Sequence, residues 1–274
     1  MKVSVIVPVY NDHWLPECLS SIPKDVELIV VHDPTQRGPG WARNQGLAQV
    51  TGNLVFFADA DDEVGNLNAL IDAQGRRMAD WTIGSFVKLG LLQDVVQDFD
   101  HEIMMSRQEV GGYIRRNLAN PRYHQMLSGC WGKLFRMRII REHNLRFDES
   151  LRTAEDLDFN YRYLDHCKSV CFSPVIAYRH IKREGSLTTR PSEAMLDVLK
   201  VLNRMERYGD IGHSFIYHSI LYVRRAPHLA GIIMRHPDFR KHIERYVPAT
   251  GNYRFLPWLM KLGFVKPVEL AARL

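Results

Sequence analysis

The sequence predicts an α/β protein with a mostly parallel central sheet flanked by helices and a helical C-terminal extension. Three observations predict it. Short apolar segments alternate with helical segments along the first hundred or so residues, which favours parallel strands with right-handed crossovers. Successive apolar segments end in polar or acidic residues. After Pro191 the alternation gives way to longer amphipathic segments rich in aromatic residues and arginine.

Length and composition allow one sizeable domain, or one domain with an appendage. The chain has 274 residues, 46% of them hydrophobic, and a net charge of +5. A mildly basic protein suits an anionic substrate or an anionic membrane surface as well as nucleic acid. The start at Met1 lacks a secretory signal pattern, and no uncharged apolar run approaches the ~20 residues needed to cross a bilayer. We therefore expect a cytoplasmic protein, with its four cysteines reduced and forming no zinc pattern.

The first half of the chain supplies the clearest elements. Residues 2–9 read as a strand that Pro8 should end, because proline cannot donate to a sheet ladder. Asp12 is a plausible N-cap for the helix that follows. Further along, Ser106 and Glu109 have the spacing of a capping box. The other predicted strands are 26–31, 54–58, 81–86, 170–172 and 175–178, with an antiparallel excursion at 87–100, and the predicted helices are 41–50, 67–78, 106–118, 137–143, 153–164, 192–208, 213–234 and 253–274.

The apolar run 54–58 breaks abruptly into Asp59, Asp61 and Asp62. Carboxylates at the end of a buried strand are costly unless something positive compensates them. Polar groups also follow the two preceding strands, at Asn11 and Asp33, and parallel strands place such ends along one edge of the sheet, where ligands bind. Hard oxygen ligands favour a divalent cation that itself holds a phosphate. The alternative is a solvated acidic turn that caps the next helix.

These segments together resemble a known family. The motifs are VSVIVPVYN (3–11), Asp33, GPGWARNQGL (38–47), FFADADD (56–62), WGKLFR (131–136) and AEDLDFNYR (154–162). Their order and spacing resemble the family 2 glycosyltransferases with a GT-A fold, most closely the bacterial members that build surface polysaccharides. One departure is His32-Asp33-Pro34-Thr35, where the family often has Asp-Asp-Gly-Ser.

The resemblance covers residues 1–190 and implies a division of the chain. Residues 1–98 would form a Rossmann-like half that binds the nucleotide sugar, and residues 99–190 the acceptor-binding and catalytic half of the same GT-A domain. Residues 191–274 would be a helical extension that either caps the fold or lies on a membrane, since basic amphipathic helices with Trp and Phe are typical of membrane-surface segments.

The resemblance also implies an activity and its residues. An inverting hexosyltransferase would move a sugar from a nucleotide diphosphate, expected to be UDP, to an acceptor hydroxyl. Asp156 would be the general base and Glu155 its neighbour in the site, although first-turn carboxylates also serve simply as helix dipole partners. A Mn²⁺ or Mg²⁺ ion would be bound by Asp61, by Asp59 directly or through water, and by His180 as a minor candidate, with Asp62 as a helper. The nucleotide pocket would be lined by Pro8, Tyr10, Asn11, Asp33, Arg43 and Asp59.

Lys133 could contact the acceptor or the diphosphate, or be a surface lysine in a structural turn. The expected acceptor is a saccharide, in particular a lipid-linked intermediate of O-antigen or capsule synthesis at the cytoplasmic face of the inner membrane. Two other classes compete. A sugar-phosphate nucleotidyltransferase would need a glycine-rich basic loop after the first strand, which residues 9–12 do not offer. A nucleic-acid-binding protein is suggested only by net charge, without a recognised motif.

Overall fold

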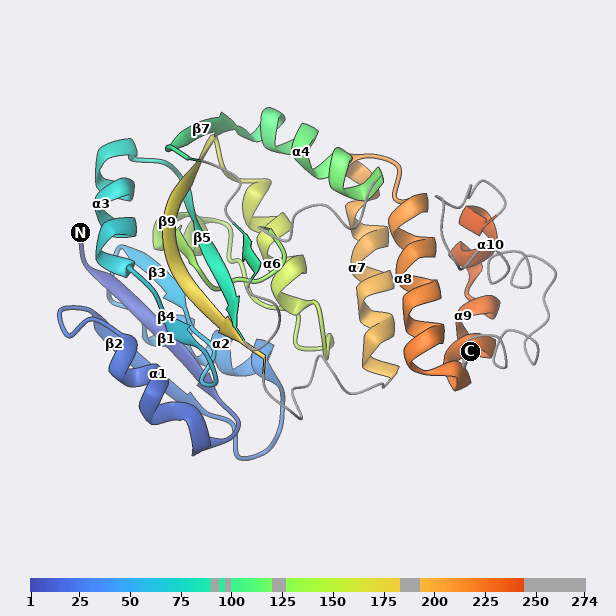
Figure 1. The fold of residues 1–274 in the computed structure, drawn as a ribbon, viewed down its shortest axis with the longest axis horizontal. Coiled ribbons are helices and arrows are strands. Elements are labelled where there is room, and N and C mark those ends of the chain that lie inside the picture. Colours follow the sequence, from blue (N-terminus) through green and yellow to red (C-terminus); the bar gives the residue numbers. More distant parts are fainter. Residues whose placement is uncertain (90–93, 97–99, 120–126, 183–192, 244–274) are drawn as a thin grey trace. The chain divides into compact units, whose positions relative to one another are not determined.

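The computed structural model describes residues 1–89, 94–96, 100–119, 127–182 and 193–243 (Figure 1). The chain forms two compact units. Unit 1 comprises residues 1–110 and 125–186, and unit 2 comprises residues 111–124 and 187–274. Unit 1 carries every candidate site residue predicted from the sequence.

A nine-stranded mixed sheet forms the centre of unit 1. β1 pairs in parallel with β2 and β3, and β5 pairs in parallel with β9. β8 lies antiparallel between β3 and β5, so β1, β2, β3, β5 and β9 all run in the same direction. Along the main path the order is β2 (Glu27–His32), β1 (Val3–Val9), β3 (Leu54–Phe57), β8 (Lys133–Arg136), β5 (Trp81–Leu89), β9 (Ser169–Ile181) and β4 (Glu63–Val64), with β6 (Asp94–Val96) on β5 and β7 (Ile103–Ser106) on β9.

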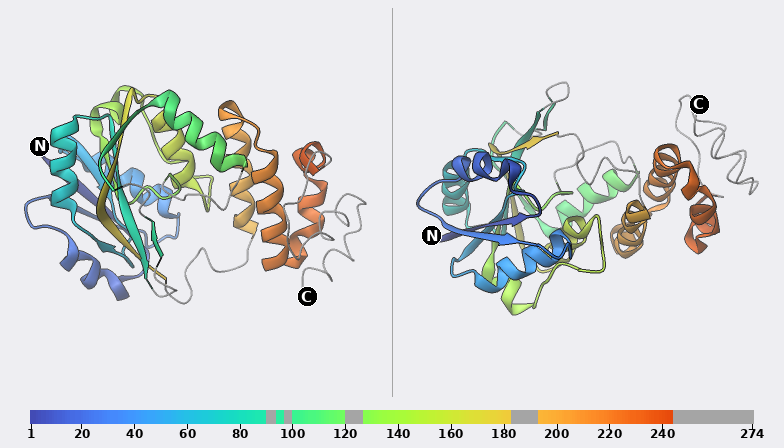
Figure 2. Two further views of the ribbon diagram at one scale, coloured as in Figure 1. Left: turned by 45° about the horizontal axis from the view of Figure 1, so that its top comes forward. Right: turned by 90° about the horizontal axis from the view of Figure 1, so that it is seen from below.

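Helices cover both faces of this sheet, as predicted (Figure 2). The alternation of side chains along β3 explains the two cores. Phe56 packs with Cys18 of α1 and Leu70 of α3 on one face. Phe57 meets Phe159 of α6 on the other, at 6.1 Å between ring centroids. The helices of this part of the chain are α1 (Leu15–Ser21), α2 (Pro39–Gln49), α3 (Leu67–Arg77), α4 (Arg107–Ala119), α5 (Met137–Glu142) and α6 (Glu155–Leu164), with a short 3₁₀ turn η1 (Asp12–Trp14) before α1.

The first strand is confirmed close to its predicted bounds, 2–9, but its expected end at Pro8 and the cap expected at Asp12 were wrong. β1 continues past Pro8 to Val9. Its pairing with β3 has already ended at Ile6, so Pro8 pairs only with β2. The cap is supplied by Asn11, whose side chain accepts a hydrogen bond from the His13 N–H at 2.9 Å, rather than by Asp12.

Local signals succeeded where the partners are close in sequence. The capping box at α4 is confirmed, since the Ser106 N–H donates to Glu109 Oε2 at 2.7 Å and the Glu109 N–H donates to Ser106 Oγ at 3.3 Å. The antiparallel excursion is confirmed by the β5–β6 pairing. By contrast, the two predicted strands near 170–178 are one 13-residue strand, β9, whose register against β5 shifts around Ser85. The short strands β4 and β7 were not predicted.

Unit 2 is helical in the part of it that the structure describes, as predicted. The helix expected over 213–234 is interrupted, because Pro227 follows Ala226 and cannot continue the hydrogen bonding of α8. The predicted helix 253–274 lies outside the described residues. No described helix is both long and apolar enough to span a bilayer. The described elements of unit 2 are residues 111–119 of α4, η2 (Glu193–Leu196), α7 (Asp197–Arg204), η3 (Met205–Tyr208), α8 (Gly212–Arg225), η4 (Pro227–Leu229), α9 (Ala230–Arg235) and α10 (Pro237–Ile243).

Candidate active site

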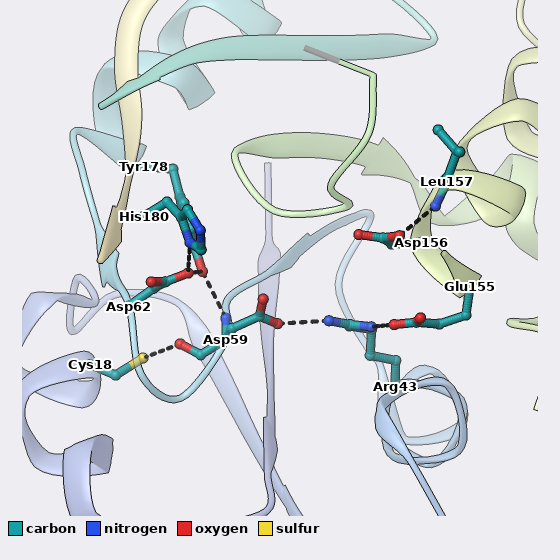
Figure 3. Close-up of polar contacts among 9 residues, drawn as sticks. All are labelled: Cys18, Arg43, Asp59, Asp62, Glu155, Asp156, Leu157, Tyr178 and His180. Carbon is teal, nitrogen blue, oxygen red and sulfur yellow. Dashed lines mark hydrogen bonds and ion pairs between the residues drawn. The ribbon is translucent and has the colours of Figure 1, made fainter. Parts of the chain in front are cut away.

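The loop after β3 is fixed by side chains from two other elements. The Asp59 N–H donates to Tyr178 Oη of β9 at 2.9 Å, and the Asp59 carbonyl accepts from Cys18 Sγ of α1 at 3.4 Å. Figure 3 shows the Asp59 carboxylate pointing away from both of these contacts, toward Arg43. The backbone of the acidic loop is thus anchored while its first carboxylate remains directed across the carboxyl edge of the sheet.

Asp62 is an anchor of the same loop. Its side chain is buried and accepts three hydrogen bonds, from Tyr178 Oη at 2.9 Å, from the Ile181 N–H at 2.7 Å and from His180 Nδ1 at 3.1 Å. These bonds tie the loop to the end of β9. The hydrogen bond to Asp62 raises the pKa of His180 above its ordinary value. With Nδ1 occupied in this way, Nε2 is the ring nitrogen that His180 could offer to a metal.

Arg43 joins the acidic loop to the helix that carries the predicted base. It lies on α2, with its side chain 5% exposed. One terminal nitrogen is 2.7 Å from Asp59 Oδ1 and the other is 2.5 Å from Glu155 Oε1 (Figure 3). The guanidinium also lies over the Phe147 ring, 5.5 Å from its centroid. A planar cation with several donors suits such a double contact.

Asp156 follows Glu155 in the first turn of α6, beside the Arg43 guanidinium in Figure 3. Its Oδ1 accepts a hydrogen bond from the Leu157 N–H at 2.7 Å. Burial and the adjacent Glu155 carboxylate raise the pKa of Asp156 to about 7, against the opposing effect of Arg43. A carboxyl group whose pKa is near neutral can hold a proton at working pH, as a general base requires.

Aromatic packing sets the position of α6. Phe159 stacks on Phe147 with 4.1 Å between centroids, and Tyr163, one turn later, packs edge-on against Phe135 at 4.9 Å. Tyr163 Oη donates to the Asp80 carbonyl at 2.8 Å and accepts from the Arg136 N–H at 2.7 Å. The apolar face of α6 therefore fixes the place of its acidic first turn.

The residues expected to bind the nucleotide lie at the ends of β1 and β2. The Asp33 N–H donates to the Val9 carbonyl at 2.9 Å, which places Asp33 beside the Tyr10 loop. Tyr10 is exposed and Pro8 half-buried. The Asp33 carboxylate is buried and accepts from the Gly38 N–H at 2.7 Å, so it also shapes the loop that leads into α2. Gly38 has a φ of 107°, which favours glycine there.

Lys133 is a buried residue, so the alternative of a surface lysine is wrong. Its Nζ donates to the Gly129 carbonyl at 2.5 Å and to the Trp131 carbonyl at 3.2 Å. Burial lowers the pKa of Lys133 to about 8. Asn160 of α6 donates to the same Gly129 carbonyl at 2.9 Å. Together they hold the turn before β8 against α6.

Sequence reasoning did not single out Tyr178, Cys18 or Asn160. Each forms part of the scaffold described above. Tyr178 lies in an apolar strand and Cys18 on the buried face of an amphipathic helix, so their sequence context predicts only core packing. The Trp131 ring, by contrast, stacks on Tyr178 at 4.7 Å and on His180 at 5.7 Å between centroids, which links the WGKLFR motif to the end of β9.

The acidic loop has the chemistry of a divalent cation site. Burial and the nearby Asp62 and Asp59 raise the pKa of Asp61 to about 6. A cation would relieve this crowding of carboxylates, and their hard oxygens suit Mg²⁺ or Mn²⁺. Within the described residues, no three His, Cys, Asp or Glu side chains are grouped so that they could hold a metal by themselves. A metal here would therefore need oxygens from a bound ligand as well.

Part of the chain matches a known family. The model for "Glycosyl transferase family 2" matches residues 23–142. GlyA, a glycosyltransferase of Streptococcus pneumoniae, is 25% identical over 262 residues, which cover 81% of this chain and 36% of that protein. The uncharacterized glycosyltransferase EpsJ of Bacillus subtilis is 24% identical over 71% of this chain and 65% of its own length. TarS of Staphylococcus aureus, a poly(ribitol-phosphate) β-N-acetylglucosaminyltransferase, is 27% identical over 68% of this chain and 36% of its own length.

Solved structures agree on the fold. TarS residues 1–349 in complex with UDP superpose with a TM-score of 0.64 at 16% sequence identity, covering 99% of this chain and 90% of that one. The complex of the same fragment with UDP-GlcNAc gives a TM-score of 0.63. The fold is therefore the GT-A fold of these TarS structures. Over residues 23–142 the chain is similar to glycosyl transferase family 2, and the curated relatives that it resembles are glycosyltransferases. It spans between about a third and two thirds of the length of these curated relatives.

Proposed function

We propose that this chain transfers a sugar from a UDP-sugar to an acceptor hydroxyl with inversion at the anomeric carbon. The observation that carries the proposal is the ion-pair chain from Asp59 through Arg43 to Glu155. It joins the loop expected to receive the donor diphosphate to the helix turn that carries Asp156. The complexes of TarS with UDP and with UDP-GlcNAc support the choice of donor.

Asp156 and the acidic loop would serve different steps of the transfer. Asp156 accepts the proton of the acceptor hydroxyl as that oxygen bonds to the anomeric carbon. The proton moves late, when bond formation has made the oxygen acidic, so a carboxylate of near-neutral pKa suffices. The diphosphate leaves from the opposite face of the sugar. Asp61 and Asp59 would hold Mn²⁺ or Mg²⁺, with His180 as a further candidate, and a bound ion would neutralise the charge that develops on the leaving diphosphate.

The nucleoside would lie at the ends of β1 and β2. Tyr10 offers an exposed ring there, and Asn11 and Asp33 offer amide and carboxylate oxygens. Asp33 would accept from the N3–H of uracil with lone pairs that its contact with Gly38 leaves over. Pro8 would form part of the wall of this pocket, where Arg43 was also expected.

The acceptor we propose is a saccharide of a bacterial surface polymer, carried on a lipid. The relatives include TarS, a poly(ribitol-phosphate) β-glucosyltransferase from Bacillus spizizenii and the succinoglycan biosynthesis protein ExoO from Rhizobium meliloti. Two of these names refer to poly(ribitol-phosphate) and the third to succinoglycan, both of which are polymers. We propose that unit 2 brings the enzyme to an anionic membrane surface, where such acceptors are available.

A thermal-shift panel tests the donor and the metal together. The full chain is heated with UDP-, GDP- and TDP-sugars, each with Mn²⁺ or with EDTA. Because a ligand that binds only the folded state raises Tm by mass action, we expect the largest increase with a UDP-sugar and Mn²⁺. Asp61→Asn should remove the metal-dependent part of that increase and leave the rest. Equal shifts in Mn²⁺ and EDTA would refute the metal assignment, and a larger shift with GDP- or TDP-sugars would refute the choice of UDP.

A further inference from the structure

The position of Arg43 does not fit a simple nucleotide contact. Both terminal nitrogens are bonded to carboxylates, from two elements that are far apart in sequence, and its side chain is 5% exposed. Taking one carboxylate away would leave a terminal nitrogen of this buried guanidinium without its charged partner, which is unfavourable. A ligand that bound Arg43 would have to reach a buried side chain that already holds two carboxylates.

The partner at the catalytic end is as constrained as Arg43 itself. The Glu155 side chain is 6% exposed. Burial raises the pKa of Glu155, whereas Arg43 acts to lower it. Arg43 therefore favours the ionised form of Glu155 and holds that side chain against α2.

Charged and titratable groups from several elements act on Asp156. On its own helix the neighbour is Glu155, and from α2 it is Arg43. The acidic loop contributes Asp59, the segment before β8 contributes Cys130, and β8 contributes Lys133. Arg43 is the cation of this set that contacts carboxylates on both sides of the site. Removing it would leave Asp156 facing Glu155 and Asp59 with less positive charge nearby.

We propose that Arg43 is a positioning residue that acts on sugar transfer through Glu155, holding the first turn of α6 and the acidic loop in one fixed arrangement. The inference rests on the proposed function, because it assigns Arg43 a part in the same reaction.

Four variants test which feature of the Arg43–Glu155 ion pair turnover requires. Arg43→Lys keeps the charge but loses the planar double contact, Arg43→Met removes both, Glu155→Gln removes the partner charge, and Arg43→Met with Glu155→Gln removes the pair. The matched control is Arg162→Met, which breaks an ion pair of 2.6 Å to the buried Asp158 on the same helix, one turn further along. Near-UV circular dichroism and thermal unfolding establish which variants are folded.

We expect the turnover number to fall by roughly 100-fold in Arg43→Met, because displacement of reacting groups by about an ångström can cost that much. Arg43→Lys should recover part of the loss, and Arg162→Met should lose little. The Kd for UDP should stay within about twofold of the wild-type value. The double variant should be no slower than Arg43→Met, since coupled residues are non-additive. The pH profile of Arg43→Met should shift to higher pH.

Three results would overturn the proposal. One is a tenfold or greater loss of UDP affinity in Arg43→Met with turnover preserved, which would make Arg43 a nucleotide contact. Another is multiplication of the two single effects in the double variant. The last comes from hydrogen exchange, which needs no activity: Arg43→Met should raise exchange both in the loop 59–62 and in the first turn of α6, and unchanged exchange in both would refute the link. If wild-type enzyme turned over no nucleotide sugar, the proposed function would fail, while the exchange result would still decide the role of Arg43.

Discussion

Asp156 is the residue on which the proposed chemistry depends most directly. A first-turn carboxylate would ordinarily be stabilised as the anion by the helix N-terminus. Here burial and the neighbouring Glu155 outweigh that effect, and the pKa of Asp156 lies near 7. The same environment that makes the anion costly makes it a stronger base. The alternative role as a simple helix-dipole partner does not require such a group.

We expect Asp156→Asn to reduce sugar transfer by roughly 1,000-fold, within the range that general-base catalysis contributes. The amide keeps the size of the side chain and can still accept from the Leu157 N–H, so UDP affinity should be unchanged. Initial rates of transfer and titration calorimetry with UDP measure the two quantities. Turnover close to that of the wild type would remove Asp156 from the role of base.

The pH dependence of the wild-type enzyme provides the control. A base must be unprotonated to act, so kcat/KM should rise as pH increases through about 7 and then level off. Residual activity of Asp156→Asn should lack this rise. A wild-type profile that falls with increasing pH over the same range would contradict the assignment.

At the scale of elements, α2 places Arg43 by packing unusually close to the sheet. A Cβ added to Gly46 would lie 2.4 Å from Ile6 Cγ2 on β1, well inside contact distance. Gly46 and Arg43 are three residues apart and so lie on the same face of the helix. Glycine at position 46 therefore allows the approach that brings Arg43 between Asp59 and Glu155.

Gly46→Ala should consequently lower the free energy of unfolding by about 1–3 kcal/mol, as overpacking of a filled core does. It should also reduce turnover, because displacement of α2 displaces Arg43. Gly75→Ala is the matched control: it lies within α3, is exposed, and its added Cβ would meet only Met1 Cε at 3.5 Å. That change should be neutral or stabilising by up to about 1 kcal/mol. Denaturant unfolding measures both, and equal effects would show that the close approach is unimportant.

Elements were predictable from sequence where their signal is local. The apolar strands β1 and β3 and the capping box at Ser106 depend on neighbouring residues, and the sequence contains those patterns. The segments near 170–178 form one strand, β9, because β5 pairs with both of them. The register of that pairing shifts near Ser85. The missed strand β4 has two residues and exists only because it pairs with β9.

For the whole molecule, the gathering of distant carboxylates at one sheet edge could be predicted, but the bonds between them could not. The direction of the strands determines that Asp33 and Asp59 follow neighbouring carboxyl ends. That Arg43 would bridge Asp59 and Glu155, and that Asp62 would hold β9 through Tyr178, depends on side-chain packing across the fold. Sequence periodicity carries no information of that kind, because each of these residues has an ordinary local context.

The helical C-terminal unit raises the remaining whole-molecule question, that of attraction to a membrane. Arg224, Arg225 and Arg235 are exposed at the ends of α8 and α9, and Ile232 between them is 39% exposed. The segment 253–274 continues the mixture of basic, aromatic and aliphatic residues in sequence. Basic residues near an anionic leaflet contribute attraction that salt screens. Apolar side chains beside them add attraction that depends little on salt.

We therefore expect the full chain to sediment with vesicles that contain anionic phospholipid, more strongly at low than at high salt, and weakly with purely zwitterionic vesicles. The double change Arg225→Glu and Arg235→Glu should lower the partition coefficient roughly tenfold or more, because it reverses two charges near the surface. The matched control, Lys24→Glu with Lys168→Glu, reverses two exposed charges of unit 1 and changes the net charge by the same amount. If both double variants lost binding equally, net charge alone would account for the attraction. If neither the wild type nor the variants bound anionic vesicles at low salt, the acceptor would have to reach the enzyme without membrane attachment by this unit.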